Sequence, residues 1–380
     1  MDETTFVIKT FVQTFEKENK VVVKKHEIED QMIKTERNFC SGILRLKIEY
    51  DDGTQNLYKK VLLKIPILGV NYDMTKDSNV YDKEIYIYQV VLPRMYKFWS
   101  GKRLTPKFYA ATALKSLILE DLSESGFKMV DKKTRLDLEH SKIALRSLAQ
   151  FHALSLKYLQ TYDIDEAKMN HSLSNLTDLE AQNIQELILF PLYDSFLKIS
   201  STLVSKNMYK ILEEYKNHIH KETQLTMNIN KNGMNVMRHG DYSIGNILFR
   251  YDTEGRVLES KMIDFQLTSI SSPSIDLIYF FVSSVQTNVY EKYRNQLFDI
   301  YLNVLNDTLS SYKFNQKYTK NDLTNDMKTY KKYYLFVIGI TLKFIMSDSS
   351  QFSDVLNTKS KEYVLVVQEW LNYLDREDLL

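Results

Sequence analysis

The sequence predicts an α+β protein with two lobes: a small β-rich N-terminal lobe and a large, mainly α-helical C-terminal lobe. Its 380 residues are more than one hydrophobic core usually holds. Alternating apolar and polar residues, typical of strands, concentrate before residue 120, whereas helical spacing dominates after it. One short β-hairpin interrupts the helical part at residues 238–266. We therefore expect an N-terminal lobe at 1–119, a connection at 120–123 and a C-terminal lobe at 124–380.

Composition narrows the function classes. The chain has 50 basic and 49 acidic residues, so no overall charge favours nucleic acid or an anionic membrane. A single cysteine, Cys40, excludes an internal disulfide and suits a reducing compartment. The N-terminus shows no signal peptide, and the most apolar stretch, 333–346, is shorter than the ~20 residues that cross a bilayer. We expect a cytoplasmic protein in which 333–346 is a buried helix.

The N-terminal lobe is predicted from strand and helix patterns. A hairpin is expected from GILRLKIEY (42–50), the turn DDG (51–53) and NLYKKVLLKIPI (56–67), with Lys64 near the end of its second arm. VYDKEIYIYQVVLPRM (80–95) has apolar residues at helical spacing and predicts a helix that closes near Pro93. TPKFYAATALKSLILEDL (105–122) predicts two further strands with a short connection.

The C-terminal lobe is predicted to be helical around one hairpin. Residues 131–159 form a long amphipathic pattern with Asp131 as a candidate N-cap. Residues 175–226 and 283–375 are also mostly helical by pattern. Between them, NILFRYD and RVLESKMIDF flank the turn TEG at 253–255, which predicts the hairpin.

The hairpin carries the strongest functional signal. Asp241 precedes its first arm, Asn246 follows five residues later, and Asp264 ends its second arm. Because a short hairpin returns the chain to its start, we expect these three side chains to converge. Such oxygen ligands suit Mg²⁺, which keeps the rest of its shell for water and phosphate. The set is typical of phosphoryl transfer, in which one Asp accepts the proton of a hydroxyl and the other groups hold the metal.

Phosphate chemistry also requires a cation from the N-terminal lobe. Lys64 follows an apolar run on a strand, where an unpaired ammonium group would be costly. Glu84, on the next predicted helix, is its natural partner. Two alternatives stay open: Lys64 as a solvent-facing residue of an edge strand, and Glu84, like Asp82, on a solvated helix face.

Other polar residues near this site have structural alternatives. HGD by itself is compatible with a plain turn, although the hairpin and Asn246 argue against that interpretation. We interpret His239 as a buried structural residue of the loop and His152 as a satisfied core histidine. Asp276 is a candidate N-cap and also a candidate brace that accepts hydrogen bonds from backbone amides of the loop, and the two roles are compatible.

The segment HGDYSIGNILFRYD…KMIDFQLTSISSPSIDLIYFF resembles the ecdysteroid kinase-like family of arthropods, also called CHK kinase-like. This family is similar to choline and aminoglycoside phosphotransferases. The shared features are HGD, Asn five residues after its Asp, DFQ, and a small-Pro-x-x-Asp-Leu segment. LILEDLS (117–123), LAQFHALS and KEIYIYQVVLP resemble further family segments, so the resemblance spans roughly residues 30–345.

The resemblance implies a bilobal protein kinase-like fold and transfer of phosphate from ATP·Mg²⁺ to a hydroxyl of an ecdysteroid or other secondary alcohol, including plant toxins. It implies that Asp241 is the catalytic base, that Asn246 and Asp264 are metal ligands, and that Lys64, paired with Glu84, binds phosphate. The segment 120–123 would be a hinge between the lobes. The backbone of Glu120, Asp121 and Leu122 would contact adenine, and the covering loop would contribute Asn38 and Ser41.

The sequence departs from the family pattern in two places. The nucleotide-covering loop reads TERNFCSG, with Glu36 where the family usually has Gly, while Asn38, Ser41 and Gly42 remain. A carboxylate beside a triphosphate is unfavourable. Ser243 also replaces an aromatic residue that often follows the HGD aspartate at this distance.

We therefore weigh three functions. The first is a small-molecule kinase, and the second is a catalytically inactive binding protein of the same fold for a hydrophobic hydroxylated molecule. The third, a protein kinase, is least favoured because Pro273 of SSPSID comes only nine positions after Asp264, too close for a long activation loop. Residues 155–235, rich in Leu, Phe, Tyr and Met, are expected to form an apolar acceptor pocket, although ordinary helix packing explains the same pattern. No oligomeric state is predicted.

Overall fold

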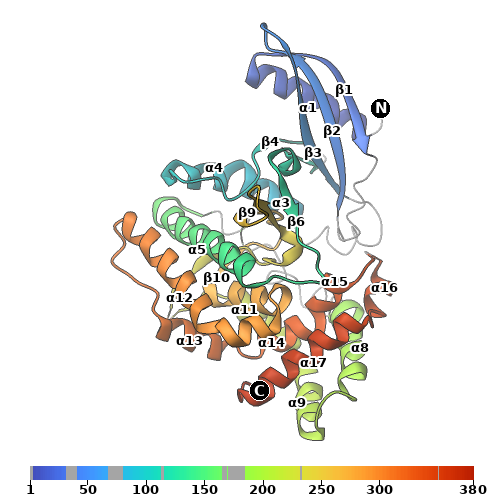
Figure 1. Cartoon of the computed structure of the whole chain (residues 1–380), viewed down its shortest axis with the longest axis vertical. Coiled ribbons are helices and arrows are strands. Elements are labelled where there is room, and N and C mark those ends of the chain that lie inside the picture. Colours follow the sequence, from blue (N-terminus) through green and yellow to red (C-terminus); the bar gives the residue numbers. More distant parts are fainter. Residues whose placement is uncertain are drawn as a thin grey trace.

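The computed structural model places a β-sheet lobe above a larger helical lobe (Figure 1). The structure describes residues 3–30, 41–66, 80–112, 115–164, 169, 185–231, 233–349 and 351–380. The predicted α+β fold class with a sheet-rich N-terminal lobe and a helical C-terminal lobe is confirmed.

The N-terminal lobe is built on a five-stranded antiparallel sheet with strand order β1-β2-β3-β5-β4. Its strands are β1 (Val22–Asp30), β2 (Ser41–Asp51), β3 (Asn56–Pro66), β4 (Phe108–Ala111) and β5 (Leu117–Glu120). The predicted hairpin is β2–β3, paired without a break from Ser41↔Pro66 to Asp51↔Asn56. At its turn the Asp52 carboxylate accepts hydrogen bonds from the backbone of Thr54 and Gln55, which explains why DDG reverses the chain.

The first helix was not predicted. Helix α1 (Glu3–Asn19) lies along the sheet and buries Ile8, Phe11 and Phe15 against strand residues (Figure 1). These residues recur at helical spacing, but the pattern is short. The expectation that the first third of the chain consists mainly of strands was therefore wrong at this end, because the sheet needs a helix to cover one apolar face.

The helix that carries Glu84 runs further than predicted. It comprises α3 (Val80–Tyr86), the π-helical segment η2 (Ile87–Val91), α4 (Leu92–Met95) and the 3₁₀ turn η3 (Tyr96–Phe98). Pro93 does not close it. Val91 and Leu92 before it keep helical backbone angles, and the π-helical hydrogen bonds of η2 end with Leu92 N–H donating to Ile87 O, next to the proline that has no N–H to donate.

The long helix predicted at the start of the C-terminal lobe is α5, which spans Leu138–Thr161 and packs against α12 (Thr287–Ser311). The predicted start at Asp131 was wrong. Asp137 is the N-cap, and its carboxylate accepts from the His140 N–H at 3.0 Å, whereas the Asp131 carboxylate accepts from Lys133 N in a preceding turn. Both aspartates have cap-like sequence contexts, and only the fold distinguishes them.

The other C-terminal helices complete this lobe. They are η4 (Leu122–Ser125), η6 (Gln185–Leu189), α8 (Phe190–Ser200), α9 (Lys206–Lys216), α10 (Ile219–Met227), η7 (Ile244–Asn246), α11 (Pro273–Ser284), α12 (Thr287–Ser311), α13 (Lys320–Thr329), α14 (Tyr333–Phe336), η8 (Val337–Thr341), α15 (Leu342–Met346), α16 (Phe352–Leu356) and α17 (Lys361–Arg376). Among the described helices, none combines the length and apolar character needed to cross a membrane.

The predicted catalytic hairpin consists of β8 (Ile247–Tyr251) and β9 (Val257–Met262), extended by β6 (Phe127–Met129) into a three-stranded sheet. Its open end is held by Ile263 N, which donates to the carbonyl of Asn246 at 3.0 Å. The hairpin therefore returns the chain to its start, next to Asn246, as expected. A second small sheet pairs β7 (Val236–Arg238) with β10 (Ser269–Ser271).

The stretch 333–346 is a buried helical segment, as predicted, formed by α14, η8 and α15. It packs on α8, and Gly339 permits this contact because an added Cβ would lie 2.7 Å from the Tyr193 ring. Lys343 is fully buried, and its ammonium group donates to Ser195 Oγ at 2.9 Å.

We propose residues 120–123 as the connection between the lobes. Strand β5 ends at Glu120, and the chain then turns through η4 into β6 of the C-terminal sheet. The Asp121 side chain caps η4 by accepting from Ser123 N at 3.0 Å. This turn fixes the direction in which the chain leaves the N-terminal sheet.

Prediction for Gly240. Gly240 has φ +85° and lies so close to Leu267 that an added Cβ would be 2.1 Å from its carbonyl oxygen. We expect Gly240→Ala to lower the free energy of unfolding by about 1–3 kcal/mol more than Gly255→Ala. Gly255 is the matched control, since it has φ +81° and no neighbouring atom within 4 Å of the added Cβ. Urea unfolding of both variants measures the difference, and equal losses would contradict the close contact.

Candidate functional site

A buried ion pair joins strand β3 to helix α3. The Lys64 ammonium group lies 2.9 and 2.7 Å from the two carboxylate oxygens of Glu84. Lys64 is 9% exposed and Glu84 is 1% exposed. Lys64 and Glu84 therefore do not face solvent, as the two alternatives required. Asp82, in contrast, is half exposed and pairs with Lys115.

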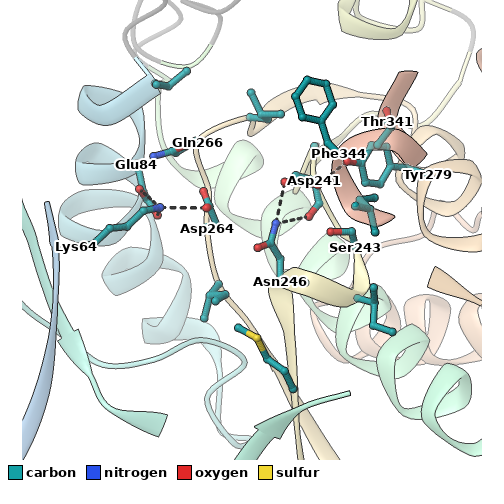
Figure 2. Close-up of a pocket in the computed structure, with 18 of the residues that line it drawn as sticks. Lys64, Glu84, Asp241, Ser243, Asn246, Asp264, Gln266, Tyr279, Thr341 and Phe344 are labelled. Atoms are coloured by element: carbon teal, nitrogen blue, oxygen red, sulfur yellow. Dashed lines mark hydrogen bonds and ion pairs between the residues drawn. The ribbon is translucent and has the colours of Figure 1, made fainter. Parts of the chain in front are cut away.

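The same lysine also contacts the C-terminal lobe. Its ammonium group lies 3.1 Å from Oδ2 of Asp264 (Figure 2). Burial opposes the charge of Lys64, but attraction to Asp264 and Glu84 outweighs it and raises the lysine pKa. Burial also raises the pKa of Glu84, with Lys64 opposing this rise and Asp264 adding to it. One cation is thus shared by two carboxylates, which leaves negative charge for a further cation.

Asp241 is held by two side chains. Its Oδ1 accepts from the Tyr279 hydroxyl at 2.5 Å, and its Oδ2 accepts from Asn246 Nδ2 at 2.8 Å. Burial raises the pKa of Asp241 to about 7, the Tyr279 hydrogen bond opposes this rise, and the charge of Asp264 adds to it. The carboxylate is therefore oriented and basic enough to accept a proton near neutral pH.

Asp241, Asn246 and Asp264 surround one space in Figure 2, with Lys64 and Glu84 beyond Asp264. Asp264 has φ +70°, unusual for a residue other than glycine, and Phe265 after it packs on the rings of Tyr88 and His239. The aromatic contacts fix the backbone at this point, so the Asp264 side chain faces Lys64.

A buried carboxylate braces the loop before Asp241. Asp276 accepts from the backbone N–H of His239 at 2.6 Å and from that of Gly240 at 3.0 Å. His152 of α5 approaches the same carboxylate at 3.1 Å with Nε2. Of the two roles considered for Asp276, the brace is the one observed, because the N-cap of α11 is Ser272.

His239 is a structural residue of this loop. Its Nε2 donates to the carbonyl of Ile263 at 3.0 Å, and its Nδ1 accepts from Asp241 N at 3.3 Å. Burial lowers its pKa, in agreement with a neutral imidazole that carries its proton on Nε2. His152 is likewise a satisfied core histidine, with Nδ1 2.7 Å from the Tyr301 hydroxyl.

The expected nucleotide contacts are described only in part. Glu120, Asp121 and Leu122 line the cavity, but the Asp121 carboxylate is committed to Arg45 Nε at 2.5 Å and to Ser123. Any contact from Asp121 to a base would therefore use its backbone. Asn38 and Glu36 lie outside the described residues, and Ser41 begins β2 without a described side chain.

The residues present fit a hard divalent cation. Among the described residues, no cluster of three or more His, Cys, Asp or Glu side chains is arranged to hold a metal. Mg²⁺ does not need one, since it binds through one or two protein oxygens together with water and phosphate. The Asp264 carboxylate and the Asn246 amide offer such oxygens on two sides of the space in Figure 2.

These groups open into one cavity of about 640 Å³ between the lobes. One end is lined by β2, β3 and the connection 120–123, and the other by apolar residues beyond Asp241. Of the described residues at this second end, those in 155–235 are Leu189, Thr223, Thr226 and Met227, and those in 333–345 are Tyr333, Phe336, Ile340, Thr341, Phe344 and Ile345. The sequence analysis assigned the acceptor wall to 155–235 and missed the contribution of 333–345.

The comparisons with known proteins agree with this geometry. The model of the ecdysteroid kinase-like family matches residues 35–314. The chain belongs to the ecdysteroid kinase-like family. It is accordingly a phosphotransferase that acts on a hydroxyl group, and a small-molecule kinase. No curated protein is similar enough in sequence to count as a match.

Solved structures give distant likenesses. An ethanolamine kinase of Plasmodium vivax is 13% identical, with a TM-score of 0.47, and the alignment covers 100% of this chain and 91% of that one. A choline/ethanolamine kinase family protein of Mesorhizobium loti is 11% identical, with a TM-score of 0.37 and coverage of 85% and 89%. A glucosamine kinase is 10% identical, with a TM-score of 0.37 and coverage of 94% of both chains.

Prediction for Tyr279. Sequence analysis did not identify Tyr279, although its position three residues after Asp276 in a helix places it on the same side. Without its hydroxyl, Asp241 loses the hydrogen bond to Oδ1 and is less well oriented. We expect Tyr279→Phe to lower kcat about tenfold or more while the KM for ATP stays within about twofold. Tyr334→Phe is the control, since Tyr334 is also buried and, among the described residues, its hydroxyl is hydrogen-bonded only to the Tyr290 hydroxyl, at 3.4 Å. Equal effects of both variants would contradict this role.

Prediction for Lys83. Lys83 is 1% exposed, and its ammonium group has no hydrogen-bond partner among the described residues. Burial, aided by the nearby charge of Arg238, lowers its pKa to about 7. Between pH 7 and the ordinary lysine pKa, the unfolded chain binds a proton that the folded chain lacks, so this group makes stability rise with pH. We expect Lys83→Met to be more stable than wild type by about 1–3 kcal/mol at pH 6, with the gap shrinking towards pH 10.

Urea unfolding at several pH values measures this gap. The exposed Lys128→Met is the control for general effects of charge removal. A gap that is constant with pH, or that grows as the pH rises, would contradict the assignment of a buried, weakly basic amine.

Proposed function

We propose that this protein transfers the terminal phosphoryl group of ATP, bound with Mg²⁺, to the hydroxyl of an apolar, ecdysteroid-like or xenobiotic secondary alcohol. The observation that carries the proposal is that Lys64, Asp241, Asn246 and Asp264, from distant parts of the sequence, all line one cavity. The apolar end of that cavity supports an apolar acceptor.

In this proposal Asp241 is the catalytic base. The acceptor oxygen approaches Asp241, which takes the hydroxyl proton as the new bond to phosphorus forms and the bond from phosphorus to the ADP oxygen breaks. Tyr279 and Asn246 keep the carboxylate oriented while it accepts the proton. The raised pKa of Asp241, about 7, suits proton transfer near neutral pH.

Lys64 and the metal groups serve the phosphates. Lys64 would stabilise phosphate charge, and Glu84 holds its ammonium group in place with two short contacts. Asn246 and Asp264 would hold Mg²⁺, which supplies positive charge at the phosphate oxygens. The backbone at Glu120, Asp121 and Leu122, with Asn38 and Ser41, would bind the rest of the nucleotide. Cys40 and the charge balance support a reducing, cytoplasmic location.

An inactive binding protein is the alternative. A chain without catalysis would have no need to keep a base, a paired lysine and two metal-binding oxygens in one cavity. Glu36, which favours this alternative, lies outside the described residues. The kinase therefore has the stronger support.

Prediction for Asp241 and Asp264. Asp241→Asn removes the proton acceptor but leaves the nucleotide contacts, so we expect phosphoryl transfer to fall at least a thousandfold while ATP affinity stays within about threefold. Asp264→Asn removes a metal oxygen with its charge, so we expect Mg²⁺-dependent ATP affinity to fall about tenfold or more. Product formation is followed in a screen of hydroxylated steroids and plant metabolites, and affinity by calorimetry.

The exposed Asp194→Asn is the control for both variants. Nucleotide affinity lost equally in both would contradict the division of roles. Absence of any phosphorylated product, together with no thermal shift from ATP·Mg²⁺, would refute the kinase and favour the binding protein.

A further inference from the structure

Among the described residues, every basic side chain that lines the cavity contacts a carboxylate, with one exception. Four basic side chains line it among the described residues: Arg45, Lys64, Lys132 and Arg238. Three of them contact carboxylates, through the pairs Arg45–Asp121 at 2.5 Å, Lys64–Glu84 at 2.7 Å and Lys132–Asp348 at 3.3 Å. Arg238 makes no ion pair with a carboxylate among the described residues.

Arg238 is fixed at the acceptor end of the cavity. It ends β7, is 4% exposed, and donates from Nε to Ser269 Oγ at 2.5 Å. This bond directs one edge of the guanidinium group into the fold and leaves the two terminal nitrogens for other contacts. Asp276 interacts electrostatically with Arg238. Its two carboxylate oxygens, however, already accept hydrogen bonds from the loop amides and contact His152.

The surroundings of Arg238 add donors rather than acceptors. Tyr333 lines the same end of the cavity, and Arg238 acts on its hydroxyl through charge and a hydrogen bond, although burial raises the tyrosine pKa overall. A hydroxyl that accepts from a guanidinium keeps its own proton to donate. A buried guanidinium that has hydroxyl partners but no carboxylate partner among the described residues leaves its charge uncompensated, so this corner favours an anion.

We propose that Arg238, with Tyr333, binds a carboxylate group of the acceptor, so that the preferred acceptors are apolar hydroxy acids. The planar fork of a guanidinium matches the two oxygens of a carboxylate, and a phenol proton adds a third hydrogen bond. The apolar residues Phe336, Ile340 and Phe344 contact the body of such a molecule. The identity of the ligand as an acceptor rests on the proposed function, whereas the anion site itself does not.

The test uses pairs of molecules that differ only in charge. The pairs are 12-hydroxyoctadecanoate with 12-hydroxyoctadecanamide, and cholate with cholamide, and all four molecules carry secondary alcohols. Calorimetry measures their affinities in the presence of Mg²⁺ and a non-hydrolysable ATP analogue. We expect the acid of at least one pair to bind about tenfold or more tighter than its amide, and Arg238→Met to reduce this ratio to within about twofold. Amide affinity should change less than about twofold.

Three further variants protect the interpretation. Arg238→Lys keeps the charge but loses the fork, so an intermediate ratio is expected from a protein that folds. Tyr333→Phe removes the phenol proton and should lower the ratio by a smaller factor. Arg256→Met is the control, since Arg256 is 71% exposed and lies on the turn between β8 and β9. Thermal unfolding confirms that each variant is folded.

The outcomes are distinct. The proposal is wrong if no pair shows a preference for the acid, including through absence of binding, or if Arg238→Met weakens acid and amide equally. It is also wrong if Arg238→Met slows transfer to every acceptor and slows ATP hydrolysis, because Arg238 then serves the phosphoryl group. Acid binding that depends on Arg238, without any phosphoryl transfer, would leave this site standing and overturn the kinase. Transfer to neutral alcohols without an acid preference would overturn this site and leave the kinase standing.

Discussion

The buried cation of Lys64 is the interaction on which the site depends. It connects three elements that are far apart in sequence: β3 of the sheet, helix α3 through Glu84, and the end of the hairpin through Asp264. A buried ion pair contributes little stability by itself because both charges lose water. Its value here is positional, since a lysine shared by two carboxylates fixes how the sheet lobe sits over the hairpin and therefore where the cavity opens.

The balance of charge along the cavity separates two kinds of chemistry. Around Asp264 and Asp241, carboxylates outnumber the ammonium group that contacts them, and this favours a divalent cation. Beyond Asp241 the described lining becomes apolar, apart from Arg238, Lys132 and a few hydroxyls. Asp241 lies at the boundary, braced from behind by Asp276 through the amides of His239 and Gly240. The base is thus fixed by the fold of its loop as well as by Tyr279 and Asn246.

Local pattern was sufficient to predict much of this arrangement. The hairpin around 253–255 followed from alternation and a turn signal. Helical spacing alone left Glu84 equally compatible with a solvated face, and its contact with Lys64 was expected from the lysine–glutamate pair of kinase-like folds. Features set by tertiary packing were not predictable in this way. Asp131 and Asp137 are equally good caps in isolation, and Pro93 predicts a helix end unless the π-helical segment η2 just before it is known. The cavity lining at 333–345 was missed because an apolar helix facing a cavity has the same pattern as one facing the core.

The contact between Gly339 and Tyr193 limits the shape of the acceptor wall. Ile340 and Thr341 line the cavity, while the glycine before them presses against the tyrosine ring on the opposite side of the same helical turn. Because the Tyr193 ring fills the space next to Gly339, this part of the cavity wall cannot move back when a bulkier molecule enters. A wider cavity would then have to come from other parts of its lining, such as Thr223 and Met227 of α10, while η8 is the rigid boundary.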